Sequence, residues 1–237
     1  MLAPEGRTIM ISGASRGIGR AIAERLHARG YNVSVGARDR DRLAGSFSHI
    51  AGSRFLACRY EAGDRDSHAR WLEETLTRFG RLDGLVNNAG TSNGFSIEAG
   101  EEEELDALVS ANVKGPLFLT RSCLPHLRTS GAGRIVNVAS LSGKRVRNDN
   151  IAYAMTKFAL MALTHGTRRI GWEDGVRATA LCPSFVATDL TAGVTKVSRS
   201  DMIAPEDLAH LAETVIALPN TASIAEMLVN CRLEDTL

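Results

Sequence analysis

Cysteine and histidine are too sparse in this sequence to build a metal site or a disulfide framework. The 237 residues include four cysteines and six histidines. The cysteines stand far apart, each beside apolar residues and without CxxC spacing, and no two histidines have HxxxH spacing. Zinc sites and disulfide frameworks need closer and more regular spacings. We therefore expect four reduced core cysteines and no metal site.

Long apolar runs and concentrated charge are also missing. No apolar run approaches the roughly 20 residues that a helix needs to cross a bilayer, and the chain shows no secretory signal. The net charge is only +1 with scattered lysine and arginine, which argues against a nucleic-acid or anionic-membrane partner. We expect a soluble, cytoplasmic protein that binds a small molecule and has neither nucleic acid nor membrane as a partner.

What the sequence does have is a regular alternation of short apolar runs and longer segments with helical spacing. Its composition, 44% hydrophobic and 23% charged, is typical of a globular protein, and no Pro/Gly/Ser-rich linker or repeat divides it. At this length we expect a single domain over residues 1–237. The acidic run 101–104 precedes an apolar segment and suits the solvated first turn of a helix.

The alternation predicts the fold class. The expected strands are 8–11, 33–37, 55–58, 82–87, 134–139, 176–181 and 224–229. The expected helices are 17–29, 66–79, 105–127, 150–170 and 205–218. Buried strands that alternate with helices indicate an α/β fold, a doubly wound parallel sheet with helices on both faces.

A glycine-rich segment joins the first expected strand to the first expected helix. It reads SGASRGIG over residues 12–19, with glycines at 13, 17 and 19. Glycines at such positions permit a tight turn, let backbone N–H groups approach a pyrophosphate and let the helix pack closely on the strand. Glycines also serve ordinary turns, but this position in an alternating chain favours a dinucleotide site.

The stretch YAMTK places a phenol and an ammonium on an otherwise apolar helix. Tyr153 and Lys157 are four residues apart and therefore share a helix face. An ammonium near a phenol favours phenolate, so the pair predicts a tyrosine pKa below its reference of about 10. The alternative is an amphipathic pair whose polar tips reach water.

These motifs and their order resemble the short-chain dehydrogenase/reductase family along almost the whole chain. The step from Ser140 to Tyr153 is 13 residues, as the family's spacing requires. The resemblance implies a three-layer Rossmann fold of about seven strands, NAD(P)(H) binding and a homotetramer or homodimer. The matching motifs are residues 12–19, NNAG at 87–90, Asn112, Ser140, YAMTK at 153–157 and PSFVAT at 183–188.

The resemblance also implies a role for each matching residue. Tyr153 would give or take the substrate proton, and Lys157 would lower its pKa and bond the nicotinamide ribose. Ser140 would hold the substrate oxygen, and Asn112 would hold a water that links Lys157 to solvent. Ser142 is a nearby hydroxyl without the family's spacing. The expected cofactor-binding residues are Gly13, Ser15, Arg16, Gly17, Ile18, Gly19, Arg38, Glu61, Asn88, Ala89, Gly90, Tyr153, Lys157, Pro183, Val186 and Thr188.

Two arginines favour NADP(H), with NAD(H) as a further option. Ala37 stands where NAD-preferring relatives carry Asp, Arg38 follows it, and Arg16 lies in the glycine segment. Two guanidiniums suit a 2′-phosphate in geometry and charge; the alternative is that both are ordinary surface arginines. Near the adenine, the spacing favours Glu61, with Asp64 as the other alignment.

Three segments depart from the family pattern. Ser184 replaces a usual glycine, which predicts a steric penalty if that position needs a positive φ. The interval 189–204 is short for a substrate lid, which suggests an open site for a bulky or polar substrate. The ending 223–231 lacks the VDGG sequence of acyl-carrier-protein reductases, which argues against fatty-acid synthesis. The segment before the catalytic helix contains three basic residues, Lys144, Arg145 and Arg147. They either belong to a solvated loop or attract an anionic substrate.

The sequence therefore predicts an NADP(H)-dependent oxidoreductase that interconverts a ketone or aldehyde and an alcohol. A non-catalytic NAD(P) sensor is the alternative from another class, but the intact Ser140, Tyr153 and Lys157 argue against it. An epimerase or dehydratase is the third reading, since extended relatives also use YxxxK. Those chains have a longer C-terminal substrate region.

Overall fold

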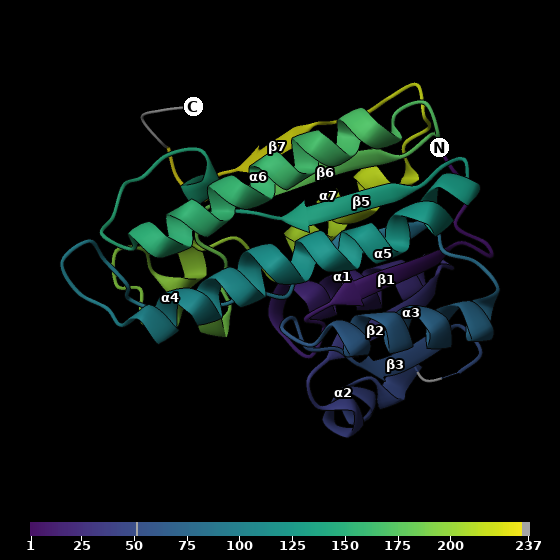
Figure 1. Ribbon diagram of the computed structural model, residues 1–237, viewed down its shortest axis with the longest axis horizontal. Coiled ribbons are helices and arrows are strands. Elements are labelled where there is room, and N and C mark those ends of the chain that lie inside the picture. Colours follow the sequence, from purple (N-terminus) through teal and green to yellow (C-terminus); the bar gives the residue numbers. More distant parts are fainter. Residues whose placement is uncertain (51, 234–237) are drawn as a thin grey trace.

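A sheet of parallel strands forms the centre of the protein (Figure 1). The computed structural model describes residues 1–50 and 52–233. The strand order is β3-β2-β1-β4-β5-β6-β7, and all neighbouring pairs are parallel. The order reverses between β1 and β4, the place where open α/β sheets bind ligands. The strands are β1 (Thr8–Ser12), β2 (Asn32–Ala37), β3 (Phe55–Arg59), β4 (Gly84–Asn87), β5 (Arg134–Val138), β6 (Arg177–Pro183) and β7 (Glu226–Val229).

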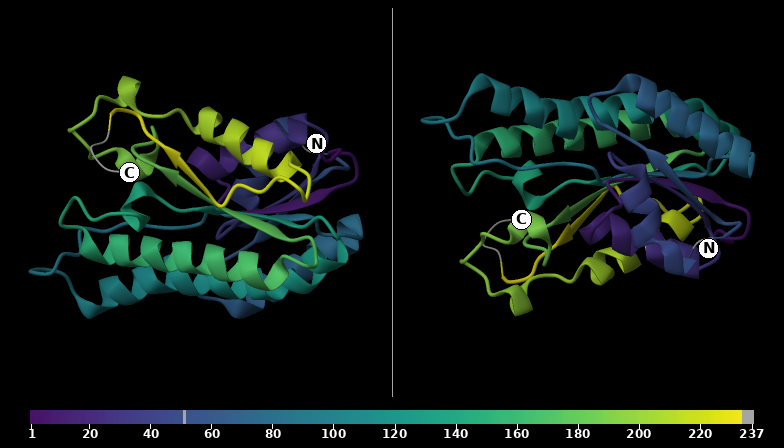
Figure 2. Two further views of the ribbon diagram at one scale, coloured as in Figure 1. Left: turned by 90° about the horizontal axis from the view of Figure 1, so that it is seen from above. Right: turned by 90° about the horizontal axis from the view of Figure 1, so that it is seen from below.

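Helices cover both faces of the sheet, so the molecule has three layers (Figure 2). One face carries α1, α2 and α7, and the other carries α3, α4, α5 and α6. The predicted α/β fold and its doubly wound parallel sheet are confirmed. Among the described residues, no helix is long and apolar enough to cross a membrane. The helices are α1 (Gly17–Ala28), α2 (Arg40–Ser46), α3 (Arg65–Phe79), α4 (Glu102–Val109), α5 (Gly115–Thr129), α6 (Ile151–Gly171) and α7 (Pro205–Ala217).

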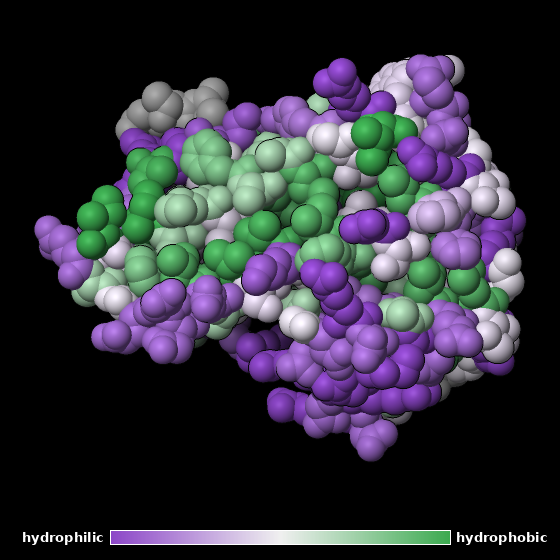
Figure 3. All heavy atoms as spheres, viewed as in Figure 1, coloured by the Kyte–Doolittle hydropathy of each residue, from purple (hydrophilic) through white to green (hydrophobic). Residues whose placement is uncertain are grey.

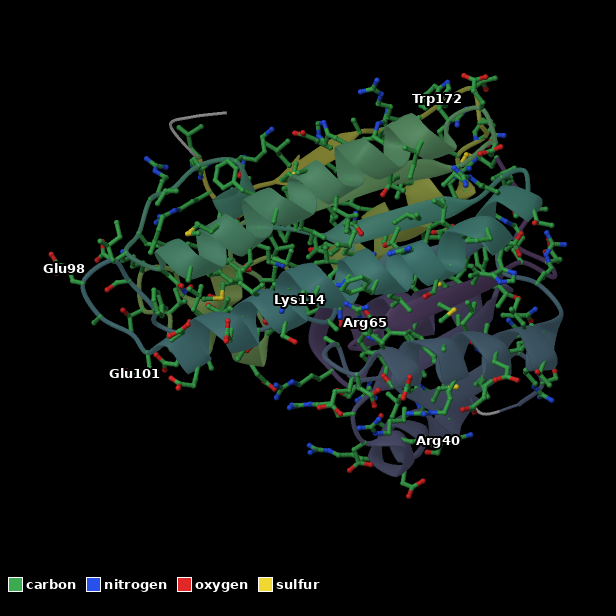
Figure 4. The ribbon with its side chains drawn as sticks, viewed as in Figure 1. Arg40, Arg65, Glu98, Glu101, Lys114 and Trp172 are labelled. Carbon is green, nitrogen blue, oxygen red and sulfur yellow. The ribbon has the colours of Figure 1, made fainter. Side chains whose placement is uncertain are left out.

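Acidic side chains begin several of the helices. The Asp39 carboxylate accepts the Arg42 amide at 2.9 Å at the start of α2, and Asp64 accepts the Ser67 amide at 3.1 Å at the start of α3. The run 101–104 forms a capping box at the start of α4, where Glu101 lies at the outer end of the helix (Figure 4). Carboxylates at these positions satisfy free amides and complement the helix dipole.

Two elements differ from the sequence prediction. Helix α2 was not expected, because its only buried residue is Leu43 and so it shows no apolar periodicity. The single helix expected over 105–127 is instead α4, a π-helical segment η2 (Ser110–Lys114) and α5. A π-helical turn continues the helix but changes the direction in which the following side chains point. Apolar spacing alone therefore does not reveal it.

A buried chain of amides and hydroxyls fixes α5 and α6 to the sheet. The Asn87 amide of β4 donates to Thr120 of α5 at 2.9 Å and to Asn137 of β5 at 2.8 Å. Asn137 in turn donates to Thr164 of α6 at 2.8 Å. Buried polar groups that are bonded in this way specify one register of helix on sheet. The network therefore sets the height at which α6 carries its polar residues.

Candidate active site

The residues that the sequence singled out gather at the carboxyl edge of the sheet. The glycine segment follows β1, Arg38 follows β2, and Glu61 follows β3. Residues 88–90 follow β4, and Ser140 follows β5. Pro183 ends β6 and leads to Val186 and Thr188, while Tyr153 and Lys157 lie in the first turns of α6. The parallel strands thus bring segments that are far apart in sequence to one edge of the sheet.

The turn after β1 needs glycine for its backbone conformation and for close contact. Gly13 and Gly17 have φ values of 67° and 56°, in the left-handed region that other residues rarely adopt. A Cβ on Gly13 would lie 2.7 Å from the Ala89 Cα, and one on Gly17 would lie 3.1 Å from the Thr188 methyl group. The turn is therefore packed between the segments after β4 and after β6.

The first turn of α1 is left open for an anion. The N-cap residue Arg16 makes no side-chain capping bond, and the first turn contains no acidic residue. By helix geometry, the amides of Gly17, Ile18 and Gly19 have no carbonyl one turn earlier to bond. Such amides and the helix dipole together favour phosphate. On these observations, the glycine segment and Ser15 fit the pyrophosphate of a dinucleotide.

Ser12 and Asn88 join the turn to the end of β4. The Ser12 hydroxyl accepts the amides of Asn88 and Ala89, each at 3.1 Å. The Asn88 side chain donates to the carbonyls of Ser12 at 3.1 Å and Gly13 at 2.9 Å. The structure thus gives Asn88 and Ala89 a role in shaping the turn. Ser12, the first residue of the glycine segment, was not predicted as a site residue, since its role depends on contacts with residues distant in sequence.

The region after β2 and β3 is rich in charge. Arg38 is exposed, and the Arg16 guanidinium binds the Asp189 carboxylate at 2.8 Å across the turn. After β3, Arg59 pairs with the carboxylates of both Glu61 and Asp64. Asp64 also caps α3, so its carboxylate has a structural role. The Glu61 carboxylate has no such capping role, so Glu61 is the better of the two acidic candidates for the contact near the adenine.

Tyr153, Ser140 and Lys157 come together at the start of α6. The Lys157 ammonium lies 5.4 Å from the centre of the Tyr153 ring and donates to the Val138 carbonyl at 2.9 Å. The Ser140 side chain lies beside the Tyr153 phenol and acts to lower its pKa, and the Ser140 hydroxyl accepts the Ser142 amide at 3.1 Å. Ser142 thus supports Ser140 through its backbone, and Ser140 is the hydroxyl that faces the phenol.

The expected lowering of the tyrosine pKa is wrong for this structure. Burial raises the pKa of Tyr153 to about 12, and the hydrogen bond with Ser140 only partly offsets it. Burial also lowers the pKa of Lys157 to about 8. At 5.4 Å from the ring centre, the Lys157 ammonium is bonded to a backbone carbonyl rather than to the phenol. Desolvation therefore dominates both groups.

Asn112 lies in the π-helical segment η2, and both polar atoms of its side-chain amide have hydrogen-bond partners. Its amide oxygen accepts the Thr91 amide at 2.9 Å, and its nitrogen donates to the Thr91 carbonyl at 2.8 Å. The same nitrogen donates to the Thr156 hydroxyl at 3.1 Å, and that hydroxyl donates to the Tyr153 carbonyl at 2.8 Å. Asn112 therefore ties the segment after β4 to the helix of Tyr153. Thr156 lay within the YAMTK stretch, but spacing alone gave it no role.

Ser184 adopts an ordinary backbone conformation. Among the described residues, only glycines have positive φ, so the anticipated steric penalty at Ser184 does not arise. Its amide donates to the Val229 carbonyl at 2.8 Å, and its hydroxyl accepts the Cys231 amide at 2.9 Å. The serine therefore joins the end of β6 to the segment after β7, a bond that glycine would not make.

Comparisons with known proteins agree with this geometry. The family model described as short chain dehydrogenase matches residues 7–198. The chain belongs to the short-chain dehydrogenase family. Membership in this oxidoreductase family accounts for the order of the motifs along the sequence.

Curated relatives carry oxidoreductase names. An agropine synthesis reductase of Rhizobium rhizogenes is 43% identical over 227 residues, which are 95% of this chain and 53% of that protein. The chain thus spans about half the length of this relative. An uncharacterized oxidoreductase of Staphylococcus saprophyticus is 30% identical over 232 residues, 97% of this chain and 99% of that one.

Solved structures share the fold. A 3-ketoacyl-(acyl-carrier-protein) reductase from Brucella melitensis, complexed with NADH, has a TM-score of 0.88 and 28% identity, over 96% of this chain and 98% of that one. An alcohol dehydrogenase from the archaeon Thermococcus sibiricus, complexed with 5-hydroxy-NADP, has a TM-score of 0.86 and 26% identity, over 94% and 95%. Both similarities extend over nearly the whole chain.

Proposed function

We propose that the protein is an NADP(H)-dependent oxidoreductase that interconverts a ketone or aldehyde and the corresponding alcohol. The observation that carries the proposal is the meeting of Tyr153, Ser140 and Lys157 beside the open first turn of α1. One group of residues can hold the substrate oxygen and move its proton, and the other can hold a dinucleotide. The reductase and dehydrogenase names of the relatives support this reading.

The cofactor would be held by the crevice between β1 and β4. The amides of residues 17–19 would bind its pyrophosphate, and Asn88, Ala89 and Gly90 would line its path. Val186 and Thr188 would close over it from the segment after β6, and Pro183, Tyr153 and Lys157 would lie by the nicotinamide. When bound, the nicotinamide supplies or accepts the hydride.

The side chains at the start of α6 handle the proton. The Ser140 hydroxyl holds the substrate oxygen, and the Tyr153 phenol donates its proton to that oxygen in the reductive direction. With a pKa of about 12, Tyr153 is neutral at physiological pH and is therefore in the form that donates. Lys157, whose pKa is about 8, supplies positive charge beside the phenolate that is left.

NADP(H) is the proposed cofactor, with NAD(H) as a weaker ligand. Arg38 is exposed at the end of β2, and Arg16 lies in the turn beside that end, with its guanidinium on an exposed carboxylate of Asp189. An exposed ion pair of this kind contributes about 0 to 1 kcal/mol, so a 2′-phosphate can displace it. Glu61 remains the proposed residue near the adenine.

We also propose a cytoplasmic homodimer or homotetramer. A band of apolar residues crosses the face formed by α5 and α6 (Figure 3). Leu117, Met155 and Phe158 are exposed there, and a groove of about 190 Å³ lies between the two helices. An exposed apolar face of this kind favours association with a second copy. Sedimentation measurements on the wild-type chain and a Phe158→Glu variant test this assignment.

The test of the function is a substrate screen. Oxidation of NADPH and of NADH is followed spectrophotometrically with a panel of ketones, aldehydes and quinones, and the reverse reaction with alcohols and NADP⁺. We expect turnover of at least one polar or bulky carbonyl compound, with a higher kcat/KM for NADPH. Tight cofactor binding without turnover of any compound would instead favour a dinucleotide sensor.

A further inference from the structure

The loop that carries Ser140 ends at a charged residue. Ser140 follows β5 and is continued by the short helix η3 (Leu141–Gly143) and Lys144. Within this loop, the amide of Gly143 donates to the Ser140 carbonyl at 2.9 Å, and that of Lys144 donates to the Leu141 carbonyl at 2.9 Å. The loop is thus one tight turn, and a displacement of Lys144 would be passed to Ser140.

This turn packs directly on the helix of Tyr153 and Lys157. A Cβ on Gly143 would lie 2.8 Å from the Lys157 carbonyl oxygen and 3.1 Å from the Met161 side chain. Only glycine allows this approach. The close contact fixes the distance between the loop and α6, but it does not prevent the turn from lifting off the helix.

Glu226 supplies the bond that holds the turn down. It is the first residue of the edge strand β7, and its carboxylate binds the Lys144 ammonium at 2.7 Å and the His165 ring of α6 at 2.7 Å. The side chains of Glu226 and Lys144 are only 19% and 27% exposed. Lys144, for which the sequence left open a solvated loop or an attraction for anionic substrates, is therefore anchored between the sheet edge and α6.

Glu226, Lys144 and His165 lie at the edge of a small apolar cluster. Ala139 and Leu141 of the loop, Met161 of α6 and Cys182 of β6 form this cluster, and β7 is the last strand of the sheet. No further strand covers the cluster on that side within the described residues. Without the bonds to Glu226, the loop of Ser140 would keep this cluster and the Gly143 contact but would lose its ionic anchor to β7.

We propose that Glu226 is a positioning residue, which holds Ser140 against Tyr153 through its bond to Lys144. The inference rests on the proposed function, because it assumes that Ser140 holds the substrate oxygen. Glu226 does not touch the reacting atoms. The Glu226 carboxylate fixes Lys144 at the far end of the turn, and the bond to His165 holds that carboxylate in place.

Hydrogen exchange tests the inference without any substrate. The variant Glu226→Gln keeps the size of the side chain and removes its charge. The matched control is Glu213→Gln on α7, because Glu213 is 14% exposed and also binds two cationic side chains, Arg25 at 2.7 Å and Arg29 at 3.2 Å. We expect the amides of residues 143–145 to exchange at least about five-fold faster in Glu226→Gln, as loss of a charged hydrogen bond implies, and to be unchanged in Glu213→Gln. Unchanged protection of residues 143–145 in Glu226→Gln would overturn the inference.

Kinetics with the fastest carbonyl compound of the screen give the second readout. Glu226→Gln and Lys144→Met should each lower kcat about ten-fold, the scale of modest misplacement, while the Kd for NADPH stays within about two-fold. The double variant should lose no more than the worse single variant, because both remove one interaction. Equal losses of kcat in Glu226→Gln and Glu213→Gln would show a general effect on stability and overturn the inference. The variant Ser140→Ala separates the two proposals, since full activity in that variant contradicts the proposed function whatever Glu226→Gln does.

Discussion

At the scale of single residues, burial decides the chemistry of Tyr153 and Lys157. The two side chains share a helix face. The Lys157 ammonium bonds the Val138 carbonyl, and desolvation raises the pKa of Tyr153 and lowers that of Lys157. The phenol is therefore neutral at pH 7 and in the form that donates a proton.

The rate of alcohol oxidation should rise with pH. Oxidation needs Tyr153 as phenolate, and its pKa of about 12 makes the phenolate scarce at neutral pH. The rate of oxidation should therefore increase between about pH 7 and pH 10, by up to about ten-fold per unit, while reduction shows no such rise. The measurement is kcat/KM for the alcohol with NADP⁺ across this range. An oxidation rate that is flat with pH would contradict the raised pKa.

The buried Lys157 should lower the free energy of unfolding at neutral pH. Its pKa is lowered from 10.5 to about 8, so the folded protein binds this proton less well than the unfolded chain does. The penalty is fully present below pH 8 and is relieved as the pH rises from about 8 to 10.5. Lys157→Met should therefore raise the free energy of unfolding at pH 7 by about 2 kcal/mol, which is the roughly 3 kcal/mol of the pKa shift less about 1 kcal/mol for the lost bond to the Val138 carbonyl, and abolish turnover. Urea unfolding at pH 7 and pH 10 checks this, and the gain should shrink at the higher pH. A loss of stability at pH 7 would contradict the expectation.

Cofactor preference is also decided by single side chains. Arg38→Asp should weaken NADPH binding by about 2 kcal/mol or more, because it replaces an attractive charge by a repulsive one, and should leave NADH binding nearly unchanged. Titration of both cofactors by fluorescence measures the two Kd values. The control is Arg42→Asp on α2, an exposed arginine of the same region that contributes its backbone amide to the Asp39 cap. Equal losses for NADPH and NADH would refute the NADP(H) assignment.

At the scale of elements, apolar periodicity predicted the strands and most helices, but not their irregular parts. Helix α2 was not predicted because it buries only one residue. The segment η2 was not predicted because a π-helical turn leaves the apolar pattern intact. The irregular element has a structural consequence, since η2 carries Asn112, whose amide bonds both the segment after β4 and α6. The local apolar pattern predicts regular helices and strands best. Irregular elements such as η2 depend on bonds between segments that are distant in sequence.

The three bonds of Asn112 predict a joint loss of stability and activity. Asn112→Ala would remove a buried amide together with its bonds to the Thr91 backbone and to the buried Thr156 hydroxyl. The free energy of unfolding should fall by about 2 kcal/mol, and turnover should fall with it. Thermal or urea unfolding measures the change. Asn230→Ala is the control, because Asn230 is exposed; an equal loss in both variants would contradict the role of Asn112.

At the scale of the whole molecule, the parallel sheet explains why motifs spread over the sequence form one site. Each strand ends at the same edge, so order along the chain was sufficient to predict that the glycine segment, Ser140 and Tyr153 meet. Contacts made by unpatterned side chains were not predictable in this way. Ser12, Thr156 and Glu226 belong to no spacing rule, and only the packing of β7, α6 and the turns shows what they bond.

The central claim is that Tyr153 moves the proton of the reaction in a site that also binds NADPH. Tyr153→Phe removes one hydroxyl and keeps the ring, so the most direct measurement pairs its turnover with its Kd for NADPH. We predict that kcat falls by about 10²- to 10⁴-fold, the range of general acid catalysis, while the Kd stays within about three-fold of the wild type. Turnover equal to that of the wild type, with NADPH bound normally, would contradict the account.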